Sequence, residues 1–266
     1  MTDAGIDKNE AKAEVKILLE ALFGCTEEDK IKGRVLKDTE LDILKEKIEY
    51  RIKEHMPIQY ITGRAWFMGE YFKVTPDVLI PRDETELLVR EAIRIIKEYN
   101  LKTVLDIGTG SGCIACTIAK QTGVHVLGTD ISSDALRIAL DNVTELNINN
   151  KAVFRKSDLF EKIRSEEKFD LIVSNPPYIP YDTELQSEVL REPKIALFAK
   201  DNGLEFYKKI IDSAPKHLNN GGFICFELGE KQSAEVKGML VKSFENIKIY
   251  KDLAGIDRVI LGRFVK

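Results

Sequence analysis

The tetrad Asn175-Pro176-Pro177-Tyr178 combines groups that could hold and orient an amino group. The Asn175 amide oxygen and the Pro176 carbonyl both accept hydrogen bonds, so together they could engage both protons of one –NH₂ group. The aromatic face of Tyr178 could lie against a planar amide or base. Both prolines stiffen the segment, because each fixes φ and removes a backbone donor. The pattern indicates methylation of an amide or exocyclic amine nitrogen and leaves open which of the two it is. The alternative is a structural Asn-Pro turn.

A glycine-rich segment runs from Asp106 through Gly108, Thr109, Gly110 and Ser111 to Gly112. Glycines let the chain turn tightly and let a ligand approach the main chain. Such a loop is a weak signal alone, because a plain turn between strand and helix has the same composition. Its spacing is G-x-G-x-G, unlike the G-x-G-x-x-G of pyrophosphate-binding turns. The Asp106 carboxylate would repel a pyrophosphate but tolerate a ligand carrying an ammonium and a sulfonium.

Two further carboxylates follow predicted strands. Asp130 lies 18 residues past Gly112 and could accept hydrogen bonds from both hydroxyls of a ribose, which fits NAD as well as other adenosine ligands. Asp158 could accept a hydrogen bond from an adenine amino group, and Phe160 could stack on the adenine ring. The alternatives are a helix cap for Asp158 and core packing for Phe160.

Short apolar strands alternate with amphipathic helices from residue 84 onward. Predicted strands cover 103–107, 124–130, 152–158, 169–175, 222–228, 247–252 and 258–264. Predicted helices cover 84–100, 112–122, 133–146, 204–218 and 231–244. This alternation predicts an α/β fold with a mostly parallel seven-stranded sheet, covered on both faces and closed by an antiparallel edge. Ligands of such sheets bind beyond the carboxyl ends of the strands, at the point where strand order reverses.

The region before this sheet divides into two further parts. Residues 1–56 are predicted to form a small helical domain, with helices over 9–24 and 40–56 and Thr39 as the N-cap of the second. Residues 57–80 are β-prone and aromatic, which predicts a hairpin linker whose aromatic side chains pack the junction. The sheet domain is then expected to cover 81–266.

Charge and composition exclude several classes of protein. The 266 residues carry a formal charge of −4, and residues 1–55 hold 11 Lys and Arg against 14 Asp and Glu. This balance argues against a domain that binds bare nucleic-acid backbone. No apolar run reaches the ~20 residues that span a bilayer, and the N-terminus has no signal-peptide pattern. The four cysteines make no disulfide framework, so we expect a reduced, cytoplasmic protein.

The cysteines and histidines give no metal-binding signal. Cys113 and Cys116 form a C-x-x-C pattern behind the glycine loop, where small side chains pack against the sheet, so packing is favoured over redox chemistry. The remaining cysteines are isolated, and the three histidines lack ligand spacing, so no metal site is predicted.

The glycine loop, Asp130 and the NPPY tetrad together resemble class I S-adenosylmethionine-dependent N-methyltransferases, whose NPPY members act on DNA adenine, RNA guanine or protein glutamine. Further motifs narrow the resemblance to the HemK/PrmC family of peptide chain release factor glutamine N5-methyltransferases. These motifs are PIQYITG at 57–63, LIPRDETE at 79–86, DIGTGSGCIA at 106–115, SNPPYIP at 174–180, Glu192-Pro193 with Ala196-Leu197, and Gly203-Leu204. The sequence departs from the family pattern at Asp83, where the second proline of IPRPETE is usual.

The resemblance implies a Rossmann-like fold, S-adenosylmethionine as methyl donor with S-adenosylhomocysteine as product, and the glutamine of a release factor's Gly-Gly-Gln motif as substrate. It implies that Asn175 and the Pro176 carbonyl orient the amide beside Pro177 and Tyr178. It also implies that the helical N-terminal domain helps to recognise the release factor. We expect a monomer with no direct nucleic-acid contact and no membrane association.

Other functions remain as alternatives. A sister enzyme acting on a ribosomal protein's glutamine would use identical chemistry. A nucleic-acid amine methyltransferase should carry a basic target-recognition domain, which residues 1–55 lack. A nicotinamide-dependent oxidoreductase would bind NAD rather than S-adenosylmethionine, and a non-catalytic binding module would not need the intact tetrad.

Overall fold

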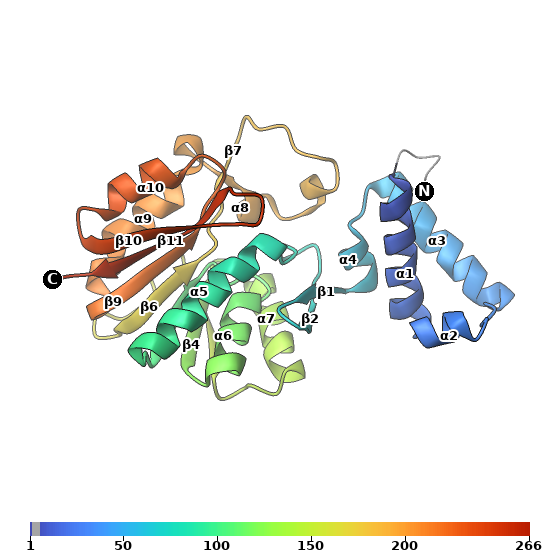
Figure 1. Cartoon of the computed structure of the whole chain (residues 1–266), viewed down its shortest axis with the longest axis horizontal. Coiled ribbons are helices and arrows are strands. Elements are labelled where there is room, and N and C mark those ends of the chain that lie inside the picture. The colour runs from blue at the N-terminus through green and yellow to red at the C-terminus, as the bar shows by residue number, and fades with distance from the viewer. Residues whose placement is uncertain (2–5) are drawn as a thin grey trace.

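The computed structural model describes Met1 and residues 6–266, so residues 2–5 of the expected N-terminal domain lie outside the described part. A helical part at the N-terminal end stands beside a larger α/β part (Figure 1). The helical part consists of α1 (Lys8–Phe23), α2 (Glu27–Ile31) and α3 (Asp38–Glu54). An apolar cluster joins α1 and α3 to the residues that follow α3, with Leu18, Leu44 and Ile58 buried at its centre. No helix of the described residues is both long and apolar enough to cross a bilayer.

The start of α3 differs from the prediction. Thr39 is not its N-cap, because the helix begins at Asp38 and Lys37 occupies the capping position. The carboxylate of Glu40 accepts a hydrogen bond from the Lys37 backbone N–H at 2.8 Å. This bond satisfies a backbone donor at the helix start, which is the role expected of a capping side chain.

The linker contains a hairpin, but it starts with a short helix that was not predicted. Helix α4 (Ile58–Thr62) precedes the antiparallel pair β1 (Arg64–Phe67) and β2 (Glu70–Lys73). The prediction of β structure at the start of the linker was therefore wrong. Pro57 suits the N-terminal end of a helix because it has no N–H to satisfy, and Gly63 ends α4 in the left-handed conformation.

Of the four aromatic side chains in the hairpin, two pack inward. Phe67 and Phe72 are buried in the core, whereas Trp66 is 59% exposed and Tyr71 is 41% exposed. Successive side chains of a strand point to opposite faces, so the hairpin buries one of each neighbouring pair. The exposed pair contact each other edge to face at 4.9 Å between ring centroids.

The sheet has seven strands in the order β10-β11-β9-β6-β3-β4-β5, and its closing pair supplies the antiparallel contacts as predicted. Its strands are β3 (Thr103–Ile107), β4 (His125–Asp130), β5 (Ala152–Lys156), β6 (Phe169–Ser174), β9 (Leu218–Glu227), β10 (Phe244–Lys251) and β11 (Asp257–Phe264). β7 (Ile179–Pro180) and β8 (Phe198–Ala199) form a separate parallel pair.

Helices cover both faces of this sheet (Figure 1). One face carries α5 (Asp83–Tyr99), α6 (Cys113–Thr122) and α7 (Ser133–Glu145), and the other carries α9 (Glu205–Ser213) and α10 (Ser233–Leu240). The short α8 (Lys194–Leu197) precedes β8, and 3₁₀ turns cover Val189–Arg191, Asp201–Gly203 and Ala214–Lys216. The helix predicted over 204–218 is shorter, because Pro215 lies where the chain changes to a 3₁₀ turn.

The strand order reverses between β3 and β6. From β3 the chain adds β4 and β5 on one side, then crosses back to place β6 on the other side. The loops after two such strands diverge to opposite faces and leave a crevice at their carboxyl ends. The loop starting at Gly108 and the tetrad starting at Asn175 follow these two strands, so the fold brings them to the same crevice.

A buried ion cluster ties the helical part to the α/β part. The Arg51 guanidinium, which is 1% exposed, donates to both carboxylate oxygens of Glu14 on α1 at 2.8–3.1 Å. It also donates to Glu188 at 2.6 Å, in the segment between β7 and α8. Nearby, Arg191 pairs with Glu54 at 3.3 Å. These contacts connect α3 to a segment that continues into the wall of the crevice.

Arg51→Met should destabilise the protein strongly, because it leaves the Glu14 carboxylate buried without its partner. We expect the free energy of unfolding, measured by urea titration, to fall by about 3 kcal/mol. Lys53→Met is the matched control on the same helix, because its exposed ion pair with Glu49 contributes at most about 0.5 kcal/mol. Equal effects of the two substitutions would contradict a stabilising role for the buried cluster.

Candidate active site

A cavity of about 250 Å³ lies at the carboxyl ends of β3, β4 and β6. Several predicted site residues line it: Gly108, Gly110, Asp130, Asp158, Asn175, Pro176 and Pro177. Much of the remaining wall is apolar and includes Val78, Ile107, Ile131 and Ile210. The cavity thus combines an apolar body with a few convergent polar groups, as small-molecule sites do.

The glycine loop presents its main chain to this cavity. Gly108 and Gly110 have φ values of +72° and +55°, which L-residues rarely adopt. The Gly110 backbone N–H donates to Asp130 Oδ2 at 2.9 Å, so the loop and the end of β4 hold each other in place. Ser111 and Gly112 are buried behind the loop and do not line the cavity.

Asp106 lies behind the loop rather than in the cavity wall. Its Oδ2 accepts a hydrogen bond from the Thr109 hydroxyl at 2.6 Å, which keeps Thr109 buried as well. Its Oδ1 is buried without a hydrogen-bond partner among the described residues. Burial raises the pKa of this carboxyl to about 7. Asp106 does not line the cavity, so its position does not support the expected contact with a bound ligand. The next two residues, Ile107 and Gly108, do line the cavity.

Asp130 is well placed to hold two ligand hydroxyls. Its Oδ1 accepts a hydrogen bond from the Ser132 N–H at 2.9 Å, and its Oδ2 accepts one from the Gly110 N–H. A carboxylate oxygen accepts more than one hydrogen bond, so both oxygens keep acceptor capacity. Burial raises the pKa of Asp130, while the N–H groups of Ser132 and Gly110 lower it.

Asp158 and Phe160 have different environments. Asp158 is exposed and lines the cavity together with Leu159. Phe160 is buried in the core beneath the sheet, where its ring stacks on His217 at 4.9 Å. It is absent from the cavity wall, so the predicted stacking of Phe160 on an adenine ring is corrected to core packing. Asp158 and Phe160 lie two residues apart after the end of a strand, where neighbouring side chains can face opposite sides. Their spacing in the sequence did not reveal this difference.

The tetrad lies where two cavities meet. Asn175 and Pro176 line the main cavity and also a smaller one of about 70 Å³, whose wall includes Tyr178 and Arg82. The Asn175 Nδ2 donates to the Thr85 hydroxyl at 3.2 Å. Among the described residues, no group donates a hydrogen bond to Asn175 Oδ1. An acceptor oxygen is thus available at the junction between the cavities.

Close packing fixes the loop after the tetrad. The Tyr178 carbonyl accepts from Gln232 Nε2 at 3.0 Å. A Cβ atom on Gly203 would lie 2.0 Å from this carbonyl oxygen, so no larger residue fits there without movement. The Tyr178 hydroxyl donates to Glu227 Oε1 at 3.2 Å. Burial and the Glu227 carboxyl raise the pKa of Tyr178, which therefore stays protonated at neutral pH.

The sequence did not lead us to predict a role for three residues near the tetrad: Thr85, Glu192 and Glu227. The buried Glu192 carboxylate accepts from the Ile80 N–H at 3.0 Å and pairs with Arg82, which lines the smaller cavity. Glu227 ends β9 at the same sheet edge as the tetrad, and burial raises its pKa to about 7. The signal for Glu227 was a carboxylate at the end of a predicted strand, as for Asp130.

In the described part of the chain, the cysteines and the metal-binding residue types form no second site. Cys113 and Cys116 are buried in α6, and burial raises the pKa of Cys113 to about 12, which disfavours the reactive thiolate. Among the described residues, no group of three or more His, Cys, Asp or Glu side chains is arranged to hold a metal ion.

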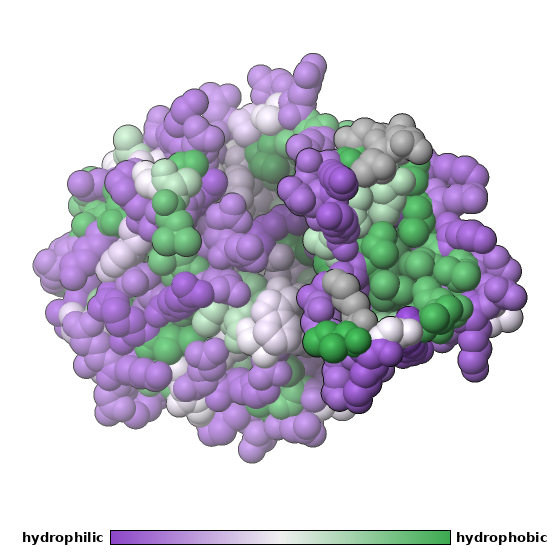
Figure 2. All heavy atoms as spheres, turned by 45° about the vertical axis from the view of Figure 1, so that its right-hand side comes forward, coloured by the Kyte–Doolittle hydropathy of each residue, from purple (hydrophilic) through white to green (hydrophobic). Residues whose placement is uncertain are grey.

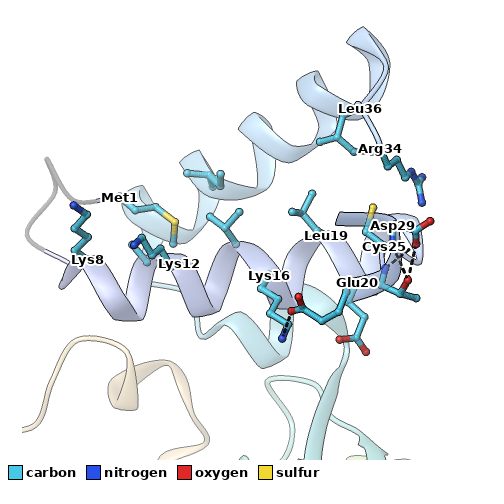
Figure 3. A pocket seen from close by; sticks show the side chains of 15 residues that line it. Met1, Lys8, Lys12, Lys16, Leu19, Glu20, Cys25, Asp29, Arg34 and Leu36 are labelled. Atoms are coloured by element: carbon cyan, nitrogen blue, oxygen red, sulfur yellow. Dashed lines mark hydrogen bonds and ion pairs between the residues drawn. The ribbon is translucent and has the colours of Figure 1, made fainter. Parts of the chain in front are cut away.

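A second hollow lies on the helical part. This groove, of about 1000 Å³, is lined by α1, α3 and the segment around α2. Apolar side chains gather on this face of the molecule (Figure 2). Leu19 and Leu36 point into the groove, while Lys8, Lys12 and Lys16 follow one another along α1 (Figure 3). Lys16 pairs with Glu27 at 2.5 Å, whereas Lys8 and Lys12 make no ion pair within the described residues.

Several known proteins have sequences similar to that of this chain. The model of the methyltransferase small domain family matches residues 84–257. The release factor glutamine methyltransferase of Clostridium acetobutylicum is 44% identical over 216 residues, covering 79% of this chain and 76% of that protein. The release factor glutamine methyltransferase of Flavobacterium psychrophilum is 38% identical and covers 97% of this chain and 93% of its own length.

A solved structure supports the fold. The 16S rRNA N2 G1207 methyltransferase of T. thermophilus, in complex with AdoMet and guanosine, superposes with a TM-score of 0.56 at 18% identity. The match covers 76% of this chain and 49% of that one. At this identity the likeness concerns the fold, which is the class I methyltransferase fold expected from the sequence.

Asp130→Ala should weaken binding of S-adenosylmethionine, because the site loses a carboxylate with acceptor capacity on both oxygens. Hydrogen bonds to charged groups contribute about 1.5–3 kcal/mol each, so we expect Kd to rise at least about tenfold in calorimetry. Asp134→Ala, an exposed carboxylate on the next helix, is the control. Unchanged affinity in a folded Asp130→Ala variant would contradict the ribose-binding role.

Asp106 should make the stability of the free protein fall as pH rises. Its folded-state pKa of about 7 exceeds its ordinary value of 3.8, so the unfolded chain loses this proton first. Between pH 4 and 7 this lowers the free energy of unfolding by at most about 1.4 kcal/mol per pH unit. Urea titrations should show that Asp106→Asn gains stability relative to the unsubstituted protein across this range. A difference that does not vary with pH would contradict the assignment, and Asp134→Asn is the control.

Proposed function

The chain belongs to the family of release factor glutamine methyltransferases, and we propose that it transfers a methyl group from S-adenosylmethionine to the side-chain amide nitrogen, N5, of a glutamine in the Gly-Gly-Gln motif of a peptide chain release factor. The observation that carries this proposal is the position of Asn175 and Pro176 at the junction of two cavities. The larger one suits a nucleoside-containing cofactor, and the smaller one suits a single side chain.

S-Adenosylmethionine, when bound, supplies a methyl group on a positively charged sulfur. The residues of the larger cavity fit such a molecule by their chemistry. Asp130 has acceptor capacity for two ribose hydroxyls, and Asp158 offers an acceptor to an adenine amino group. The glycine loop offers close approach to its main chain, and the anionic Asp130 and Asp158 suit a ligand with a net positive charge.

The amide nitrogen of glutamine is a poor nucleophile because its lone pair is delocalised into the carbonyl. Asn175 Oδ1 and the Pro176 carbonyl would accept its two N–H groups, which turns the lone pair toward the larger cavity. Both acceptors bind more strongly as positive charge develops on the nitrogen, so they stabilise the transition state more than the ground state. As the new N–C bond forms, the bond from sulfur to the methyl carbon would break and leave S-adenosylhomocysteine. The alkylated nitrogen is acidic and would release one proton to water, so no strong base is required.

Tyr178 and the prolines would complete the substrate site. Tyr178 lines the smaller cavity, where its ring can lie against the flat amide. Pro177 lines the larger cavity and shares in the rigid segment that holds the acceptors. Because these groups are ordered before the substrate arrives, little entropy is lost when the amide is aligned.

We also propose that residues 1–56 recognise the release factor, that 57–80 link the two domains, and that 81–266 form the methyltransferase domain. The groove between α1 and α3 supports the first point, because it combines apolar side chains with Lys8 and Lys12, which form no ion pair with another described residue. This combination suits an apolar segment of the release factor that carries acidic residues. The net acidity of residues 1–55 gives no support to direct nucleic-acid binding.

The remaining assignments follow from the substrate. A translation factor is a cytoplasmic protein, so we propose a cytoplasmic, monomeric enzyme without membrane association. A ribosomal-protein glutamine and a nucleic-acid amine are the alternative substrates that the same acceptor pair could orient.

Methyl transfer can be tested with radiolabelled S-adenosylmethionine against purified release factor, ribosomal proteins and DNA in parallel. We expect label on the release factor alone, and a release factor whose Gly-Gly-Gln glutamine is replaced by alanine should accept none. Preferential labelling of a ribosomal protein or of DNA would overturn the proposed substrate.

Asn175→Ala should lower kcat by at least about a hundredfold, because it removes one of two acceptors that act on the developing charge. Calorimetry should show that S-adenosylmethionine still binds with a similar Kd. Asn149→Ala, at an exposed asparagine outside the site, should leave both quantities unchanged. Near-full activity of Asn175→Ala would refute the amide-orienting role.

A further inference from the structure

The orientation of the Asn175 amide decides whether this residue can serve the reaction. An asparagine amide has an acceptor on one side and two donors on the other, and rotation by half a turn exchanges them. With Oδ1 at the cavity junction Asn175 accepts from a substrate N–H, whereas with Nδ2 there it would oppose that N–H with its own donor. Some neighbouring group must therefore select one orientation.

Thr85 is the side chain that contacts the donor side of this amide. It is the third residue of α5, is 2% exposed, and accepts from Asn175 Nδ2 at 3.2 Å. A hydroxyl carries one proton and can both donate and accept. If Thr85 donates its proton to another group, it can only accept from Asn175, and this fixes the orientation of the Asn175 amide. If that proton were free, Thr85 could equally donate to Oδ1 and hold the amide in the wrong orientation.

Glu227 is a buried carboxyl near Thr85. It is 1% exposed at the end of β9, and its Oε1 already receives the Tyr178 hydroxyl at 3.2 Å. Its Oε2 is buried with no hydrogen-bond partner among the described residues, and the Thr85 hydroxyl lowers the pKa of the Glu227 carboxyl. In its ionised form this carboxyl has only acceptors, so Oε2 would attract the Thr85 proton and leave the Thr85 oxygen to accept from Asn175.

We propose that Thr85 and Glu227 form a positioning pair that orients the Asn175 amide with its oxygen toward the substrate. The two residues contact the two ends of the tetrad: Glu227 receives the hydroxyl of Tyr178, and Thr85 accepts from Asn175. This inference rests on the proposed function of Asn175 and adds to it the residues that select its working orientation. Neither member of the pair touches the reacting atoms.

The test compares Thr85→Val, which removes the hydroxyl at nearly constant shape, with Thr85→Ser, which keeps it. We expect Thr85→Val to lower kcat about tenfold with little change in the Kd of S-adenosylmethionine, since one buried hydrogen bond is lost. Thr85→Ser should retain at least about half of the activity. Thr117→Val is the matched control, because Thr117 is a buried threonine on α6, outside the walls of both cavities, whose hydroxyl has no partner.

A second measurement needs neither cofactor nor turnover. In ¹⁵N NMR spectra of the free protein, the Asn175 side-chain amide signal can be identified by its loss in Asn175→Ala. Hydrogen bonding to Thr85 should protect its protons from exchange in the unsubstituted protein and in Thr85→Ser, and this protection should be lost in Thr85→Val.

The outcomes separate this inference from the proposed function. Full activity and full protection in Thr85→Val would overturn the positioning role, even where Asn175→Ala is inactive. Equal loss in Thr85→Ser and Thr85→Val would also overturn it, because a packing role for the methyl group would then explain the effect. If Asn175→Ala is fully active, the proposed function of Asn175 fails, whereas the NMR result still decides whether Thr85 orients the amide.

Discussion

The proposed need to hold two acceptors on one amide nitrogen would explain most of the architecture around the tetrad. Asn175 follows a central strand, so its backbone is fixed by the sheet, and the prolines after it restrict the loop. The loop is then packed against Gly203 and Gln232 at a distance that admits no extra side-chain atom. Each of these features removes a degree of freedom that would otherwise have to be ordered during the reaction.

The same site carries an electrostatic cost. Asp106 and Glu227 are both buried, and burial raises the pKa of each to about 7. Water would stabilise these charges far better than the interior does, so their presence lowers the stability of the free protein at neutral pH. Neither carboxyl lines a cavity, but Asp106 bonds Thr109 in the glycine loop and Glu227 bonds Tyr178 in the tetrad, so both costs arise directly behind the proposed site.

The helical part is coupled to the site through chain segments that also line it. Arg51 on α3 binds Glu188, and the following residue, Val189, lines the smaller cavity. Glu192, a few residues further on, pairs with Arg82 in the same wall. The helices and the proposed substrate cavity are therefore connected by direct contacts through one short segment.

The sequence by itself determined the alternation of strands and helices, the antiparallel edge and the placement of the glycine loop, Asp130 and the tetrad after particular strands, because apolar periodicity and turn residues act locally. It misplaced the N-cap of α3 by two residues, from Lys37 to Thr39, and it missed the short helix α4 at the start of the linker. Only the tertiary structure decided that Phe160 packs in the core and that Thr85 and Glu227 meet Asn175 and Tyr178. Thr85 and Glu227 are brought to the tetrad by contacts between distant segments, which no local pattern encodes.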